Sequence, residues 1–184
     1  RPSWEPSKPK QSTTFGRSLE TTFDGGSGQA GNFFDVYVMN DITIFQFDIH
    51  TRSKTTVNVE IYTKEGSHKG FETNKMAWTQ ICKTSVMGQG LNNVTIVPSK
   101  VTSPVVIPRN SLHSFYITLD TPDLRYTFGV KYGSVFLEND DLIVYEGKGS
   151  AGKFGTTFKP RVWNGIIHYS IEVGASNGGA DMGS

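Results

Sequence analysis

The sequence predicts an all-β domain, a β-sandwich or jelly roll of about eight to ten antiparallel strands with no substantial helix. Three observations predict this class. Apolar and polar residues alternate at period two along much of the chain, turn residues recur at short intervals, and no segment has the apolar period of an amphipathic helix. The 184 residues suffice for one such domain with a buried core.

The alternation is regular in three segments, residues 57–62, 115–120 and 163–173, where the side chains of one parity are mostly apolar or aromatic. Such segments are typical of strands with one face in the core and the other in solvent. Residues 33–39 and 42–49 are further β-rich segments. We therefore expect all five segments to form strands.

The segment 42–49 has an irregularity, because its apolar parity changes between Ile44 and Phe45. This change indicates either a β-bulge or a strand that is covered on both faces. The only helix-like segment, residues 70–77, is expected to form a single turn. Clusters of Gly, Pro, Asn and Asp predict turns between the strands, as at residues 64–67, 88–90, 108–110, 121–123 and 138–141.

Charge and composition exclude several classes of function. Lys and Arg number 18 against 17 Asp and Glu, so the net charge of +1 gives no signature of a protein that binds nucleic acid or an anionic membrane. No apolar run reaches the roughly 18 residues of a membrane-spanning helix. A charged fraction of 19% with many Ser, Thr, Asn and Gly residues is typical of a secreted β-protein. We therefore expect an extracellular or cell-surface location.

The two ends differ in composition from the middle of the chain. Residues 1–14 carry prolines at positions 2, 6 and 9, which predict an extended arm or linker. Residues 174–184 form a Gly-rich tail with almost no side chain that can pack. The packed β-sandwich is therefore expected to comprise residues 15–173.

The arm predicts contact with another molecule. Trp4 is a large apolar side chain in an otherwise polar segment, and Phe15 and Phe23 follow it. An extended arm can add to the sheet edge of a neighbour, with Trp4 as the anchor. Ordering such an arm costs about 1 to 2 kcal/mol per residue, so it needs a substantial partner surface. We therefore expect a homo-oligomer or a polymeric assembly.

No motif predicts catalysis. Residues 147–152 match G-x-G-x-x-G, but the β-branched, aromatic and proline residues after them exclude the helix that would bind a phosphate, so we interpret the motif as a glycine hairpin loop. The four histidines are scattered, no G-x-S-x-G motif occurs, and His50 is expected to be a hydrogen-bonded structural residue. Cys82, the only cysteine, is expected to be buried and inert. The chain is thus predicted not to be an enzyme; a histidine-dependent hydrolase is the third-ranked alternative.

The spacing of His and Cys does not fit a zinc site. Calcium suits the chain better, because two loops are rich in oxygen ligands, one at Asp24 and the other at Asp140 and Asp141. Neither loop has the spacing of an EF-hand. Each is therefore either a calcium site or an ordinary turn, and no other cofactor is predicted.

Aromatic residues indicate a second kind of partner. Trp78, Trp163 and Tyr132 could stack on the flat faces of sugar rings, unless these large rings fill the core instead. Asn93 begins an Asn-Val-Thr sequon for N-glycosylation, which matters only if the chain is secreted.

Several motifs recur together in one kind of module. They are TFDGGSGQAGNFFD at residues 22–35, FDIHT at 47–51, IYTKEGS at 61–67 and PRVWNG at 160–165. With them, about residues 21–173 resemble a β-rich module of predicted secreted and cell-surface proteins of diatoms, which has looser versions in bacterial surface proteins. The resemblance implies a module that often occurs in tandem after Pro/Ser/Thr-rich linkers, and it carries over no catalytic residue.

We therefore predict a non-enzymatic extracellular module with a structural or adhesive role, which self-assembles through its N-terminal arm. The alternative is a carbohydrate-binding module that recognises a cell-wall or extracellular polysaccharide. In both cases the chain would act through its surface. We expect no pocket in which a histidine, a hydroxyl and a carboxylate converge.

Overall fold

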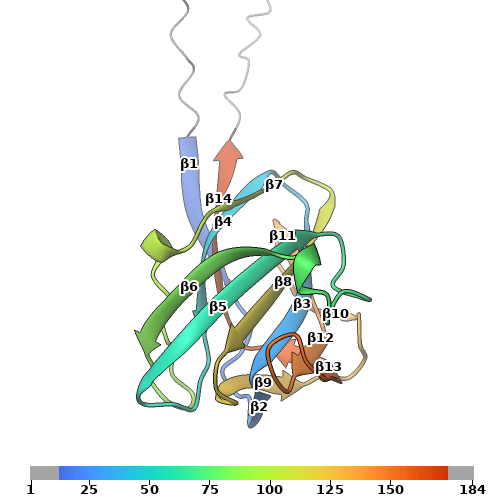
Figure 1. Cartoon of the computed structure of the whole chain (residues 1–184). Coiled ribbons are helices and arrows are strands. Elements are labelled where there is room, and N and C mark those ends of the chain that lie inside the picture. The colour runs from blue at the N-terminus through green and yellow to red at the C-terminus, as the bar shows by residue number, and fades with distance from the viewer. Residues whose placement is uncertain (1–12, 174–184) are drawn as a thin grey trace, which may run out of the picture.

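The computed structural model describes residues 13–173, which form two antiparallel β-sheets packed face to face (Figure 1). The prediction of an all-β sandwich without a substantial helix is confirmed. Fourteen strands occur in this part of the chain, more than expected, because several have only three or four residues and are too short to show an alternation. No helix within residues 13–173 is both long and apolar enough to cross a membrane.

The smaller sheet has four strands. Their order across the sheet is β1 (Thr13–Glu20), β14 (Gly165–Val173), β4 (Ile42–Ile49) and β7 (Val105–Ile107).

The larger sheet is built around β3 (Gly31–Val38). On one side of it lie β8 (Ser111–Leu119), β5 (Thr56–Glu65) and β6 (Thr79–Met87). The other side of β3 pairs with two short strands in succession, β11 (Leu142–Tyr145) and β12 (Gly147–Ser150). Beyond β11 lies β10 (Val135–Glu138), and beyond β12 lie β13 (Thr157–Trp163), β9 (Leu124–Phe128) and β2 (Ser27–Gln29).

Two single-turn 3-10 helices connect strands. The first, η1 (Lys75–Ala77), lies in the segment where a single helical turn was predicted, and the second is η2 (Ser99–Val101).

The core lies between the two sheets and is filled by the apolar side chains that alternate onto the inner face of each strand. Trp163 is fully buried and stacks on Phe34, with ring centroids 4.6 Å apart and an interplanar angle of 11°. Phe47 of the smaller sheet meets Phe115 of the larger one at 4.8 Å. Cys82 is a buried free thiol, as predicted. Burial raises the pKa of this thiol, which disfavours the thiolate form.

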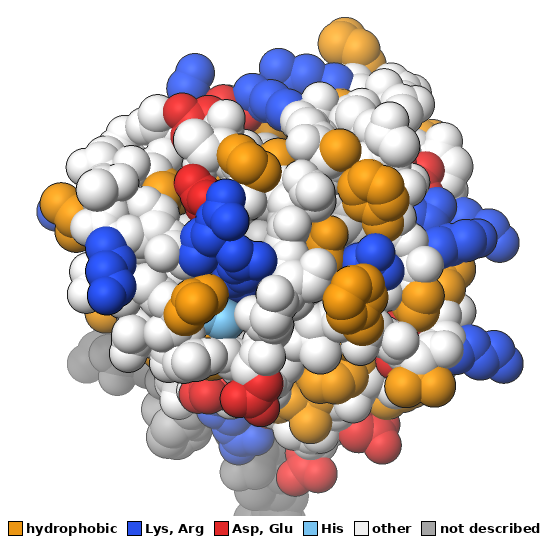
Figure 2. All heavy atoms as spheres, turned by 90° about the horizontal axis from the view of Figure 1, so that it is seen from below, with side chains coloured by type: hydrophobic (Ala, Val, Ile, Leu, Met, Phe, Trp, Pro, Cys, Tyr) orange, Lys and Arg blue, Asp and Glu red, His pale blue; other side chains and the backbone are white. Residues whose placement is uncertain are grey.

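The surface carries scattered hydrophobic side chains. Seen from below, they lie singly or in small groups among uncharged polar side chains, with Lys and Arg between them (Figure 2). Such scatter is normal for a folded domain.

The irregularity predicted in residues 42–49 is a β-bulge. His168 pairs with Gln46 and Tyr169 with Ile44, so Phe45 is the extra residue of β4. The bulge lets the apolar side chains on both sides of it reach the core.

The prediction of one strand over residues 163–173 is wrong, because the chain changes sheets at Asn164. Trp163 ends β13 in the larger sheet, and Gly165 begins β14 in the smaller one. A Cβ on Gly165 would lie 2.2 Å from the Trp163 ring and 2.3 Å from the Asp48 carbonyl oxygen, so only glycine fits this crossing.

The predicted glycine hairpin loop at residues 147–152 is wrong for its first four residues, which form β12. A Cβ on Gly147 would lie only 1.9 Å from the carbonyl oxygen of Phe33 on the paired strand. The glycines here allow close approach of two backbones. The loop itself begins at Ala151.

The N-terminal boundary of the domain also differs from the prediction. The first strand, β1, begins at Thr13 and pairs with β14 of the same chain, from Thr13 opposite Val173 to Glu20 opposite Ile166. The backbone of Phe15 therefore belongs to the sandwich. Trp4, the rest of the predicted arm and the tail 174–184 lie outside the described residues.

Candidate binding site

The outer face of the larger sheet carries an unusual set of side chains. Alternation along β3 puts Phe33, Asp35 and Tyr37 on this face, and their partners on β8 are Tyr116, Ser114 and Leu112 in the same order. The β5–β6 connection, residues 66–78, crosses this face; we call it the covering loop.

An aromatic cluster beneath the covering loop holds it in place. Phe33, Tyr62, Trp78 and Tyr116 are buried there, and the rings of Phe33 and Tyr116 stack at 3.8 Å with an angle of 7°. The indole nitrogen of Trp78 donates to the carbonyl oxygen of Phe71 at 2.9 Å. This second apolar cluster leaves pockets on either side of it.

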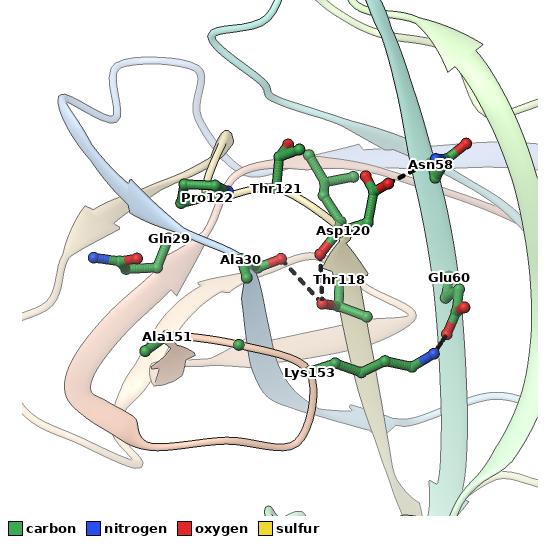
Figure 3. Close-up of a pocket in the computed structure, with 12 residues that line it drawn as sticks. Gln29, Ala30, Asn58, Glu60, Thr118, Asp120, Thr121, Pro122, Ala151 and Lys153 are labelled. Atoms are coloured by element: carbon green, nitrogen blue, oxygen red, sulfur yellow. Dashed lines mark hydrogen bonds and ion pairs between the residues drawn. The ribbon is translucent and has the colours of Figure 1, made fainter.

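The pocket at one end of the face has a volume of about 410 Å³ and is lined mainly by polar and charged side chains (Figure 3). The amide of Asn58 donates to the Asp120 carboxylate at 2.7 Å, and Lys153 forms an ion pair with Glu60. These groups largely satisfy one another, and no aromatic ring lines this pocket. It offers little for recognising a ligand.

The pocket at the other end has a volume of about 530 Å³. We call it the tyrosine pocket, because rings from three separate segments, Tyr37 on β3, Tyr132 before β10 and Tyr145 on β11, line it together with Leu112. Tyr37 and Tyr145 are half-buried, so part of each ring is accessible. Its volume lies in the range of about 300–1,000 Å³ that is typical of small-molecule sites.

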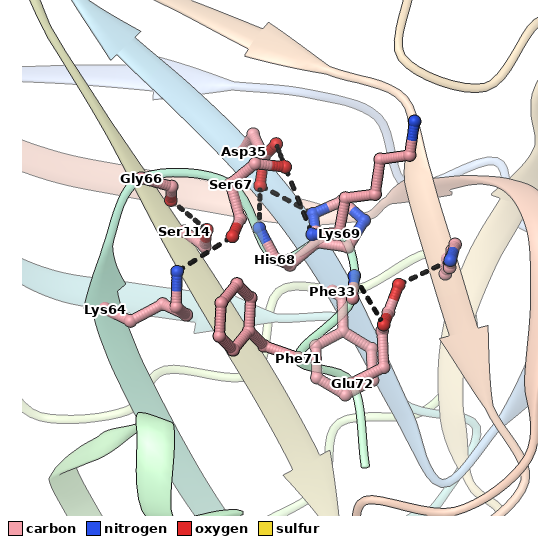
Figure 4. A network of polar contacts seen from close by, with 12 residues as sticks. Phe33, Asp35, Lys64, Gly66, Ser67, His68, Lys69, Phe71, Glu72 and Ser114 are labelled. Atoms are coloured by element: carbon pink, nitrogen blue, oxygen red, sulfur yellow. Dashed lines mark hydrogen bonds and ion pairs between the residues drawn. The ribbon is translucent and has the colours of Figure 1, made fainter. Parts of the chain in front are cut away.

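Polar groups beside these rings form a connected chain of hydrogen bonds. Nδ1 of His68 lies 2.5 Å from Oδ1 of Asp35, and Nε2 of His68 lies 3.0 Å from the Tyr132 hydroxyl. Ser67 donates from its hydroxyl to Oδ2 of Asp35 at 2.6 Å, and the His68 backbone N–H donates to Oδ1 (Figure 4). His68, itself part of the covering loop, is 2% exposed, and the contacts at both ring nitrogens fix the orientation of its ring.

The charge states of the residues in this hydrogen-bonded series follow from their contacts. Burial alone would raise the pKa of Asp35, but the hydrogen bond and charge of His68 and the Ser67 hydroxyl together outweigh it and lower the pKa. The ionised carboxylate can only accept, so Nδ1 of His68 is the donor. Burial, with the negative charges of Glu72 and Asp35, raises the pKa of Tyr132 to about 12.

A buried carboxylate fixes the segment that carries Tyr132. Glu146 is 5% exposed and accepts hydrogen bonds from the backbone N–H groups of Val130 and Lys131, at 2.8 to 3.0 Å. The β9–β10 loop, residues 129–134, is therefore rigid beside the pocket.

We expected no pocket in which a histidine, a hydroxyl and a carboxylate converge. The convergence of His68, the Tyr132 hydroxyl and Asp35 shows that this expectation was wrong. The sequence could not show it, because Asp35 and Tyr132 are far apart in the chain. The order of the hydrogen bonds, carboxylate to histidine to hydroxyl, resembles that of a catalytic triad. Here, however, the hydroxyl is a phenol whose pKa of about 12 keeps it neutral. Ser67 bonds to Asp35 and not to the histidine. The arrangement therefore favours hydrogen bonding to a ligand over nucleophilic attack.

Of the three residues expected to stack on sugars, two are buried and the third, Tyr132, lines the tyrosine pocket. Trp163 is fully buried in the core. Trp78, the last residue of the covering loop, is 7% exposed and packs in the aromatic cluster. The ring of Tyr132 lies in the pocket, but the ammonium groups of Lys148 and Lys159 lie 5.1 and 5.2 Å from its centroid. Tyr37, Tyr132 and Tyr145 are all half-buried, and the sequence reasoning missed Tyr37 and Tyr145. The signal for Tyr37 was its parity, which it shares with Phe33.

The predicted calcium loops have other contacts. Oxygens of Asp141 accept hydrogen bonds from Arg17, Asn40 and the Tyr169 hydroxyl, so donors already surround this carboxylate. Asp24 and Asp140 are exposed. Within residues 13–173, no three His, Cys, Asp or Glu side chains are grouped where they could hold a metal ion.

Asn93 is exposed, and its amide donates to the carbonyl oxygens of Gln89 and Leu91 at 3.1 and 3.0 Å. Phe23 lies in the domain, where its ring is 5.3 Å from that of His50.

In comparisons with known proteins, no protein family and no curated protein matches this chain.

Proposed function

We propose that this chain is a non-enzymatic extracellular adhesion module, and that it binds carbohydrate in the tyrosine pocket. The observation that carries the proposal is the position of two half-buried rings, Tyr37 and Tyr145, beside the fixed Asp35–His68–Tyr132 chain. Sugar rings present apolar faces that pack on aromatic rings and hydroxyl groups that need oriented polar partners. The pocket supplies both.

Preorganisation supports a binding role. His68 and Tyr132 are held by hydrogen bonds before any ligand arrives, so little side-chain entropy is lost on binding. The Tyr132 hydroxyl already bonds to Nε2 of His68, and its oxygen keeps a lone pair that can accept a hydrogen bond from a ligand. The composition and the resemblance to cell-surface modules support an extracellular location.

Binding to a panel of soluble cell-wall polysaccharides, measured by calorimetry, tests the proposal. We expect at least one polysaccharide to bind, and we expect Tyr37→Ala and Tyr145→Ala each to weaken it about tenfold, because each removes a stacking ring. Val106→Ala is the control, since Val106 is 75% exposed on β7 of the other sheet. If no polysaccharide binds, or if both tyrosine variants bind like the parent chain, the proposal is wrong.

The same panel tests the non-enzymatic part. We expect no release of reducing sugar or acid from polysaccharides and esters. Turnover that disappears in His68→Ala would instead make the Asp35–His68–Tyr132 chain a catalytic group.

Self-assembly is a second candidate function, favoured by the position of β1. This eight-residue strand is an edge of the smaller sheet, and within residues 13–173 it pairs only with β14. An unpaired edge can accept a strand from another copy. We expect deletion of residues 1–12, which leaves β1 intact, to lower the molar mass measured by light scattering; an unchanged mass would count against the arm.

A further inference from the structure

The β9–β10 loop and the strand ends beside it expose large apolar side chains. Val130 is 94% exposed, Phe128 at the end of β9 is 63% exposed, and Val135 at the start of β10 is 49% exposed. Single exposed apolar residues are common, and here three occur within eight residues of one connection.

This loop does not owe its exposure to flexibility. Glu146 accepts from the backbone N–H groups of Val130 and Lys131, and the Gly133 N–H donates to the Glu146 carbonyl oxygen at 3.0 Å. The Ser134 N–H closes a turn on the Lys131 carbonyl oxygen at 3.0 Å. The buried Glu146 carboxylate thus fixes the loop backbone in a conformation that exposes the Val130 side chain to solvent.

Basic side chains lie on and beside this loop. Lys131 is exposed within the loop, the guanidinium of Arg161 lies 4.4 Å from the centroid of the Phe128 ring, and the ammonium of Lys159 lies 5.2 Å from that of Tyr132. Neither β9, nor the loop, nor β13 contains an acidic residue, and the Glu146 carboxylate that accepts from the loop backbone is only 5% exposed.

We propose that this rigid loop docks on an anionic phospholipid surface, with Phe128 and Val130 entering the interfacial region and Lys131, Lys159 and Arg161 facing the headgroups. Exposed apolar side chains beside basic groups match the apolar boundary and the anionic headgroups of such a surface. Basic residues near an anionic bilayer add attraction that falls off within a Debye length. The net charge of +1 did not indicate such a partner, because a sum over the whole chain does not show which basic residues lie together.

Co-sedimentation of the full chain with sugar-free vesicles tests this inference separately from carbohydrate binding. We expect the chain to bind phosphatidylcholine vesicles that contain phosphatidylglycerol, to bind pure phosphatidylcholine weakly, and to dissociate as salt is raised. The double variant Phe128→Ser and Val130→Ser should weaken binding at least about tenfold. Lys131→Ala should weaken it about fivefold.

Met76→Ser is the matched control, because Met76 is 93% exposed on η1 and should not contribute. Thermal unfolding of each variant shows whether the domain remains folded. The inference is overturned if the chain ignores the anionic vesicles, or if the double variant binds them as well as the parent. It is also overturned if the same substitutions abolish a dimer seen without vesicles, since the loop would then contact a second copy.

Discussion

At the scale of single residues, buried polar side chains connect segments that are distant in the sequence. His50 is fully buried, and its Nε2 accepts a hydrogen bond from the Asn92 backbone N–H at 2.9 Å. Its Nδ1 lies 3.1 Å from Oδ1 of Asn164, the residue at which the chain changes sheets. The hydrogen-bonded role predicted for His50 is confirmed, but its partners could not be predicted, because a sequence does not show which loops meet at the end of a sandwich.

These contacts make stability depend on pH. Burial lowers the pKa of His50 despite the opposing effect of the hydrogen bond that Nδ1 donates to Asn164, so the folded state favours the neutral ring. The unfolded chain, with a histidine pKa of about 6.5, takes up the proton first. The contribution of His50 is therefore complete above about pH 6.5 and is lost as the pH falls below that value.

Urea unfolding at several pH values measures this effect. We expect His50→Gln to lose about 1–3 kcal/mol at neutral pH, because Asn92 and Asn164 lose a buried partner. The stability of the variant should fall less steeply than that of the parent between about pH 7 and pH 5. Equal slopes would show that His50 is not the titrating group.

At the scale of elements, prediction succeeded where the alternation lay within one strand, and it failed at residues 163–173, where the chain changes sheets at Asn164. The segments at residues 57–62 and 115–120 and the bulge in β4 agree with the sequence, because a half-buried strand imposes a period of two. The strand β12 was missed, because glycines have no side chain to alternate. Glycine is required there by the neighbouring backbone, which is a tertiary constraint.

The register of β12 against β3 gives a sharp prediction. We expect Gly147→Ala to destabilise the domain by at least about 3 kcal/mol, because the added methyl group would meet a backbone carbonyl oxygen that cannot move aside without breaking the pairing. Gly152→Ala is the matched control, since a Cβ there meets nothing within 4 Å. Denaturant unfolding of both variants measures the difference; a similar midpoint for the two would show that β12 does not pair with β3 in this register.

At the scale of the whole molecule, the outer face of the larger sheet provides the candidate site. Of the residues selected from the sequence, only Tyr132 lines the tyrosine pocket. The pocket joins β3, the covering loop, the β9–β10 loop and β11, so its composition depends on long-range pairing. Residue types alone indicated aromatic side chains, but they could not separate the rings that fill the core from those that reach solvent.

Nuclear magnetic resonance of the labelled chain, titrated with soluble oligosaccharides from a polysaccharide that binds, measures the location of the contact surface directly. We expect the largest shift changes in the backbone amides around Tyr37, His68 and Tyr145, while the edge of the smaller sheet stays unchanged. Shift changes confined to the pocket of Asn58 and Lys153, or to the smaller sheet, would contradict a carbohydrate site in the tyrosine pocket.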